Sequence, residues 1–138
     1  MSYKKLKEMI KQFDLTGKVA IVTGSSKGIG EAIARGLAEH GAKVVISSRK
    51  QEACDNVVEK LKADGFDAIG IACHVGDDAQ RKNLVSSTIE HFGGVDILIN
   101  NAATNPTFAP LIQAQEETFD KIMNVNVKAC MLLANLCF

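Results

Sequence analysis

The sequence has no tryptophan, a single tyrosine and two prolines, and aromatic residues make up only 5% of its 138 positions. It has no run of about 20 apolar residues, the length that a helix needs to cross a bilayer, and no apolar secretory signal at its start. It also carries no net charge, because 16 basic residues balance 16 acidic ones. No global field draws nucleic acid or an anionic lipid surface to such a chain. We therefore expect no nucleic acid partner and no membrane span.

Cysteine pairs at metal-ligand spacing are also missing. The four cysteines, at positions 54, 73, 130 and 137, form no CxxC pair. Cys73 precedes His74, but adjacent residues rarely point toward one metal, and a structural zinc site needs four ligands. We expect no metal site and four reduced thiols. Reduced thiols are typical of a reducing compartment, here the cytosol or, as an alternative, an organellar matrix.

From residue 18 onward, short apolar segments alternate with longer segments of helical periodicity. The strands are expected over residues 18–23, 43–47, 67–73 and 95–99, and the helices over 29–40, 51–63, 77–92 and about 115–136. Strands that are apolar throughout are covered on both faces. The alternation therefore predicts an α/β protein with a Rossmann-type doubly wound parallel sheet, truncated after about four strands. In the helix over 77–92, we expect Leu84, Val85 and Ile89 to face the core.

Residues 1–14 differ from this pattern, because they are rich in lysine. Their apolar residues recur at the spacing of an amphipathic helix: Leu6, Met9, Ile10 and Phe13. We expect a short helix packed on the domain surface, with a membrane-surface or targeting segment as the alternative. Residues 15–138 then form one partial α/β domain of ordinary composition, with 46% apolar and 23% charged residues.

A glycine-rich turn joins the first predicted strand to the first predicted helix. Gly24 permits the tight turn, Gly28 lets a pyrophosphate approach the backbone, and Gly30 lets the helix pack closely on the strand. The free amides and the dipole at the helix start favour negative charge. Glycines that only mark a strand-to-helix turn are the alternative, but they do not explain three at this spacing. The residues predicted to bind a dinucleotide here are Gly24, Ser25, Ser26, Lys27, Gly28, Ile29 and Gly30.

The end of the second predicted strand bears on which dinucleotide is bound. Ser48, Arg49 and Lys50 follow this strand, and no carboxylate occurs before Glu52. An acid at this place bonds the ribose 2′-hydroxyl of NAD, whereas a guanidinium binds a 2′-phosphate through two parallel hydrogen bonds. Lys27 adds a second positive charge. We predict that Ser48, Arg49 and Lys50 contact the cofactor, which is NADP(H) rather than the alternative NAD(H).

The spacing of the three glycines resembles the TGxxxGIG signature of the short-chain dehydrogenases/reductases. Residues 100–103 resemble the NNAG motif of this family with alanine in place of the last glycine, and residues 119–128 are similar to its WDxxxxVNxxG helix. The resemblance covers residues 13–136. Within the family, residues 45–51, 73–76 and 101–108 resemble the peroxisomal-type NADP-dependent carbonyl and retinal reductases (the member-four-like group), although bacterial sugar and alcohol dehydrogenases share similar strings.

The resemblance implies further site residues and partners. His74 and Val75 stand where the family usually has Asp-Val in contact with adenine, and Asn101, Ala102 and Ala103 belong to the cofactor site. Asn126 is implied as the catalytic asparagine, which in the family holds the water of a proton relay. An asparagine that bonds the backbone between strand and helix is the alternative, and both roles can coexist. The resemblance also implies a small carbonyl or alcohol substrate for the full-length family and a homo-oligomer for a complete chain.

The catalytic serine, tyrosine and lysine of the family follow its fifth strand, and the tyrosine acts as general acid/base. The only tyrosine here is Tyr3. By resemblance the function is that of an NADP(H)-dependent carbonyl reductase or alcohol dehydrogenase, an oxidoreductase. The 138 residues alone are expected to be inactive. The alternative is a catalytically inactive NADP-binding fragment or dimerisation partner.

Overall fold

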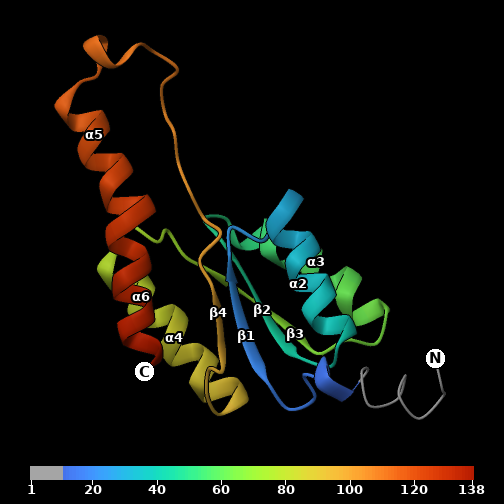
Figure 1. Cartoon of the computed structure of the whole chain (residues 1–138). Coiled ribbons are helices and arrows are strands. Elements are labelled where there is room, and N and C mark those ends of the chain that lie inside the picture. Colours follow the sequence, from blue (N-terminus) through green and yellow to red (C-terminus); the bar gives the residue numbers. More distant parts are fainter. Residues whose placement is uncertain (1–10) are drawn as a thin grey trace.

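The four predicted strands form one parallel sheet in the order β3-β2-β1-β4 (Figure 1). The structure is a computed structural model that describes residues 11–138. The strands are β1 (Val19–Thr23), β2 (Lys43–Ser48), β3 (Ala68–Ala72) and β4 (Ile97–Ile99). In the centre of the sheet, Val22 lies opposite Ile46 of β2 and Ile99 of β4. The predicted Rossmann-type parallel sheet is confirmed.

Helices cover both faces of this sheet (Figure 1). They are α2 (Gly28–Glu39), α3 (Gln51–Ala63), α4 (Asp78–Phe92), α5 (Glu116–Met123) and α6 (Ala129–Cys137), with a short 3-10 turn η1 (Leu111–Gln113) before α5. A π-helical segment η2 (Asn124–Lys128) joins α5 to α6. The helix predicted over about 115–136 is therefore interrupted by a wider turn, a feature that often occurs at functional sites. Most of the amphipathic helix predicted over residues 1–14 lies outside the described residues.

Two hydrophobic cores lie on opposite faces of the sheet. Successive side chains of a strand point to opposite faces, so Val22 and Ile46 pack with α2 and α3, whereas Ile21 and Val45 pack with α4 and α6. All four side chains are fully buried. Each such residue contributes about 1.5–3 kcal/mol relative to an exposed position. Burial on both faces explains why the strands are apolar throughout.

One predicted core position is wrong. Ile89 of α4 is 46% exposed, whereas the neighbouring Thr88 is fully buried. The Thr88 hydroxyl donates a hydrogen bond to the Leu84 carbonyl oxygen at 2.7 Å. This bond offsets the cost of burying the hydroxyl. The rotation of α4 about its axis therefore decides that Thr88 faces the sheet, although isoleucine is the more hydrophobic residue.

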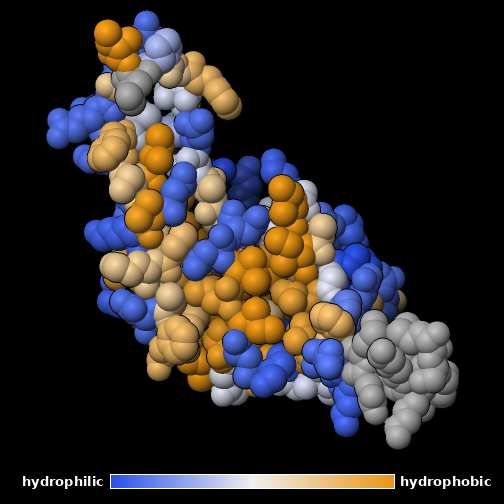
Figure 2. Space-filling model, viewed as in Figure 1, coloured by the Kyte–Doolittle hydropathy of each residue, from blue (hydrophilic) through white to orange (hydrophobic). Residues whose placement is uncertain are grey.

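Strand β4 lies at the edge of the sheet and pairs with β1 only. Apolar side chains gather over β4 and β1 in the middle of the view in Figure 2. Asp96 directly precedes β4. Its carboxylate accepts a hydrogen bond from the Val19 amide at 2.8 Å and lies 3.7 Å from the Lys18 ammonium.

Within residues 11–138, no helix combines the length and the hydrophobicity needed to cross a bilayer.

Candidate dinucleotide-binding site

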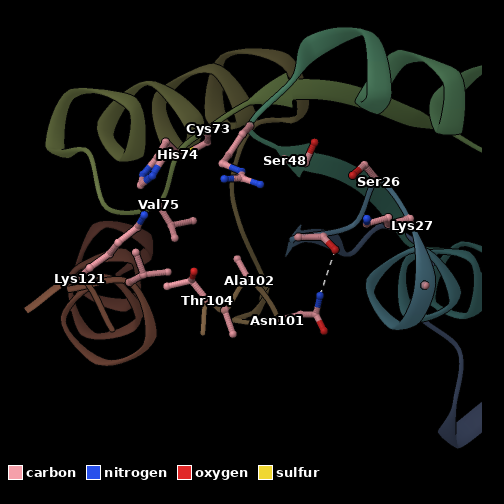
Figure 3. Close-up of a pocket in the computed structure, with 15 residues that line it drawn as sticks. Ser26, Lys27, Ser48, Cys73, His74, Val75, Asn101, Ala102, Thr104 and Lys121 are labelled. Carbon is pink, nitrogen blue, oxygen red and sulfur yellow. Dashed lines mark hydrogen bonds between the residues drawn. The ribbon is translucent and has the colours of Figure 1, made fainter. Parts of the chain in front are cut away.

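A cavity of about 520 Å³ lies where the carboxyl ends of the four strands meet the starts of the helices (Figure 3). In open α/β sheets, ligands bind in such crevices at the point where the strand order reverses. Here the order reverses between β1 and β4. The residues that line the cavity are Gly24, Ser26, Lys27, Gly28, Ser48, Arg49, Cys73, His74, Val75, Asn101, Ala102, Ala103, Thr104, Lys121 and Val125.

Two glycines of the glycine-rich turn adopt left-handed backbone. Gly24 and Gly28 have φ angles of 65° and 61°, in the left-handed region that side chains with a Cβ rarely adopt. A Cβ added at Gly24 would lie 3.0 Å from the Cα of Ala102. A Cβ added at Gly28 would meet no atom within 4 Å. The backbone at Gly28 is therefore open to a ligand, and the start of α2 fits a pyrophosphate.

Four predicted binding residues do not line the cavity: Ser25, Ile29, Gly30 and Lys50. The Ser25 hydroxyl donates to the Val22 carbonyl at 2.6 Å and accepts from the Ser47 amide at 2.9 Å. It therefore ties the turn to β2. Ile29 is 75% exposed, and Gly30 is buried in the contact between α2 and the turn. Lys50 is exposed and precedes the first turn of α3.

Thr23 and Asn101 join the ends of β1 and β4 below the cavity. The Thr23 hydroxyl donates to the Ile99 carbonyl and accepts from the amides of Asn101 and Ala102, at 3.0 to 3.2 Å. The Asn101 side-chain amide donates to the carbonyls of Thr23 and Gly24, both at 3.1 Å, and Figure 3 marks the bond to Gly24. Thr23 was not among the predicted site residues. The sequence could have indicated it, because a threonine at the end of an apolar strand has a hydroxyl that needs hydrogen-bond partners when it is buried.

The ring of His74 is held in place by its own loop. Its Nδ1 accepts a hydrogen bond from the Gly76 amide at 3.1 Å, and the His74 amide donates to the Gln80 side-chain oxygen at 2.8 Å. The Asn124 side-chain amide donates to the Gly76 carbonyl at 3.2 Å. The start of η2 therefore braces the loop that carries His74 and Val75.

Asn126, the predicted catalytic asparagine, makes two hydrogen bonds to the backbone of Thr104. Its Oδ1 accepts from the Thr104 amide at 2.8 Å, and its Nδ2 donates to the Thr104 carbonyl at 2.9 Å. This is the backbone-bonding alternative of the sequence analysis. The contacts identify Asn126 as a positioning residue for the cavity wall at 101–104, and a water-holding role stays a prediction.

The charge of the cavity wall is positive. Of its 15 residues, all within residues 11–138, none is acidic and three carry cationic side chains: Lys27, Arg49 and Lys121. Lys27 and Lys121 lie at opposite ends of the cavity (Figure 3). Like-signed charges in a cleft attract a polyanion. Lys121 was not predicted, because its place in the wall depends on the orientation of α5 relative to β3.

Cys73 lies in the cavity wall but is only 2% exposed. Burial raises the pKa of its thiol from 9.0 to about 11. The thiol is therefore protonated at neutral pH and is no nucleophile. All four cysteines are free. Among residues 11–138, no group of three or more His, Cys, Asp and Glu side chains could hold a metal ion.

We expect Cys73 to react with iodoacetamide about 100-fold more slowly in the folded chain at pH 8 than in the chain unfolded in urea, because its thiolate fraction falls with the raised pKa. Since the pKa is raised, the rate should increase about tenfold per pH unit above pH 8 until pH 11. Mass spectrometry of the alkylated peptides measures both rates. Equal rates in the folded and unfolded chains at pH 8 would contradict the burial of this thiol.

Several known proteins are similar in sequence to this chain. The family model for short chain dehydrogenases matches residues 18–138. Tropinone reductase-like 3 from Erythroxylum coca is 53% identical over 117 residues, which cover 85% of this chain and 45% of that protein. Dehydrogenase/reductase SDR family member 4 from Sus scrofa is 53% identical over 119 residues, which cover 86% of this chain and 43% of that protein. The chain therefore spans about half the length of these relatives.

Solved structures share the fold as well. Gluconate 5-dehydrogenase from Burkholderia cenocepacia, in complex with NADP and tartrate, matches with a TM-score of 0.86 at 32% identity, over 94% of this chain and 50% of that chain. Hydroxysteroid dehydrogenase from Escherichia coli matches with a TM-score of 0.85 at 31% identity, over 91% of this chain and 52% of that chain. With its parallel sheet, its glycine-rich turn and the family match over residues 18–138, the chain belongs to the short-chain dehydrogenase/reductase family.

Proposed function

We propose that this chain binds NADP(H) as the cofactor-binding part of an oxidoreductase that interconverts a small carbonyl compound and an alcohol. The observation that carries the proposal is the charge of the cavity, which has three cations and no acid in its wall. Arg49 follows β2, where an acid in NAD-specific domains bonds the ribose 2′-hydroxyl. A relative of known structure, the gluconate 5-dehydrogenase, was solved with NADP.

Each part of the cofactor has residues in the cavity wall that suit it chemically. The open backbone at Gly28 and the start of α2 would hold the pyrophosphate. Arg49, with Ser48 and Lys27 nearby, would hold the 2′-phosphate. In this proposal, His74 and Val75 would contact the adenine, and residues 101–103 would contact the ribose of the nicotinamide half. When bound, the cofactor supplies the hydride that is exchanged with the carbonyl carbon.

Calorimetric titration of the chain with NADPH and with NADH tests this proposal. We expect NADPH to bind at least about tenfold more tightly, since a charge-assisted hydrogen bond to a phosphate contributes roughly 1.5–3 kcal/mol. The preference should shrink as salt is added, because the Arg49 and Lys27 side chains are exposed and therefore screened. Equal affinities for the two nucleotides would contradict NADP specificity, and the absence of binding would contradict the whole proposal.

A second candidate function is an NADP-binding module that does not turn over substrate. Its basis is that the only tyrosine among these 138 residues, Tyr3, precedes the residues that match the family model. The family's general acid/base is a tyrosine. An assay of NADPH oxidation with a generic dicarbonyl separates the two candidates. Oxidation above the buffer rate by the 138-residue chain would rule out the inactive module.

We also propose that α5, η2 and α6 pack against a second copy of the chain. Four exposed apolar side chains follow one another at four-residue intervals along these helices: Phe119, Met123, Val127 and Met131. This spacing places them along one face, and the last three line a shared surface hollow. The proposal agrees with the homo-oligomer implied by the sequence. Sedimentation velocity that detects only monomers at high concentration would contradict it.

The free thiols of all four cysteines support the proposal that the protein works in a reducing compartment, the cytosol or an organellar matrix. Fluorescence microscopy of the tagged protein tests the location. Accumulation in a secretory compartment would contradict it.

A further inference from the structure

We propose that the end of the cavity formed by His74 and Lys121 binds a 6-oxopurine dinucleotide at least as well as the adenine dinucleotide. The inference rests on the proposed function, because it assumes that the cavity binds a purine dinucleotide with its base near His74. It adds a specificity for the base, which follows from the hydrogen-bonding groups that the described side chains present there.

The His74 ring, which lines the cavity, has one free donor and no free acceptor. A backbone amide can only donate, so the hydrogen bond from the Gly76 amide fixes Nδ1 of His74 as the unprotonated ring nitrogen. In the neutral ring the proton is then on Nε2, which becomes a donor. The ring lies close against Gly76, where an added Cβ would be 2.9 Å from the His74 Cε1. Asn124 bonds the Gly76 carbonyl and holds this arrangement from η2.

Lys121 adds further donors at the same end of the cavity. Its side chain extends from α5 toward His74 (Figure 3). An ammonium group has three donors and no acceptor. Lys121 takes part in none of the ion pairs found among residues 11–138. Its charge is therefore available to a ligand.

The side chains that the β3 end, α5 and η2 contribute to this end of the cavity offer no oxygen acceptor, and the one nearby hydroxyl is that of Thr104, beyond β4. Those that the β3 end, α5 and η2 contribute to the cavity are Cys73, His74, Val75, Lys121 and Val125. None carries a carboxylate, amide or hydroxyl oxygen. An aspartate at position 74, as the family usually has, would supply an acceptor.

Purine edges differ in what they require from such a wall. Adenine presents an acceptor at N7 and a donor, the amino group, at C6, whereas a 6-oxopurine presents acceptors at both N7 and O6. Lysine and arginine are accordingly the common partners of the N7 and O6 edge. The donors of His74 and Lys121 can bond O6, whereas neither side chain can accept a hydrogen bond from the adenine amino group.

Calorimetric titration with NADPH and with reduced nicotinamide hypoxanthine dinucleotide phosphate tests the inference. For the unmodified chain we expect the hypoxanthine cofactor to bind as tightly as NADPH or more tightly. In His74→Asp, the ratio of the two dissociation constants should shift toward NADPH by about fivefold or more, the low end of the discrimination from a good base contact. In Lys121→Met, the hypoxanthine cofactor should lose more affinity than NADPH does.

Lys128→Met is the matched control, since Lys128 is exposed in η2 and does not line this cavity. It should leave the ratio unchanged. The ratio for the unmodified chain decides the question even if His74→Asp does not fold. Binding of NADPH at least tenfold more tightly than the hypoxanthine cofactor would overturn the inference and leave the proposed function intact. If neither nucleotide binds, the proposed function itself fails.

Discussion

Replacing Arg49 with glutamate is expected to reverse the nucleotide preference, so that the chain binds NADH more tightly than NADPH. Arg49 lies at the end of β2 in the wall of the positive cavity. The change removes a charge-assisted partner of the 2′-phosphate and places a negative charge beside it. We expect the dissociation constant for NADPH to rise about 100-fold, the combined size of one lost charged hydrogen bond and the new repulsion. The affinity for NADH should stay the same or improve, because a carboxylate there can accept from the ribose hydroxyl.

Two further variants control for this effect. Arg49→Met should weaken NADPH without strengthening NADH, since it removes the cation and adds no acceptor. Lys62→Met removes a positive charge from the exposed far end of α3 and should change neither constant. If Arg49→Glu and Lys62→Met gave the same ratio of affinities for NADPH and NADH, Arg49 would not face the 2′-phosphate.

Replacing Gly30 with alanine is expected to destabilise the fold by about 3 kcal/mol, at the upper end of the usual cost of overpacking. An added Cβ would lie 2.6 Å from the Asn101 side-chain nitrogen and would overlap the Gly24 carbonyl. Both are fixed atoms, because Asn101 bonds the carbonyls of Thr23 and Gly24. Relief of the clash would therefore separate α2 from the ends of β1 and β4. Urea unfolding followed by circular dichroism measures the free energy of unfolding.

Gly36→Ala is the matched control in the same helix. A Cβ added at Gly36 would meet no atom within 4 Å. Alanine is favoured over glycine in a helix interior by about 0.5–1 kcal/mol, so this variant should unfold at a higher urea concentration than the unmodified chain. Equal stabilities of the two alanine variants would mean that Gly30 is not in close contact with the turn.

The sheet, the glycine-rich turn and several residues that line the cavity could be predicted, because each depends on residues close together in the sequence. The apolar runs that became β1 to β4 are recognisable without knowledge of their neighbours, since strands covered on both faces need no alternation. Gly24 and Gly28 were predicted to lie in the turn between β1 and α2, and both adopt left-handed backbone there, a conformation that few residues other than glycine adopt. Ser48, Arg49 and His74 line the cavity because the carboxyl ends of parallel strands meet at one edge of the sheet.

The rest depends on contacts between distant segments. Ser25 and Ser26 are adjacent and chemically identical, yet only Ser26 lines the cavity, because the Ser25 hydroxyl bonds the Ser47 amide of β2. The contribution of Lys121 required the orientation of α5 relative to β3. The proton position on His74 required the hydrogen bond from Gly76. No periodicity in the sequence encodes these three-dimensional relations.

Backbone amide chemical shifts recorded by NMR during titration with NADP+ test the central claim most directly. We expect the largest changes at Gly28, Arg49, His74 and Ala102, which follow four different strands and line one cavity. Small changes are expected at Met123, Val127 and Met131, which lie on a separate hollow. Shift changes confined to that hollow, or no changes at saturating NADP+, would contradict the claim that the ends of the strands bind a dinucleotide.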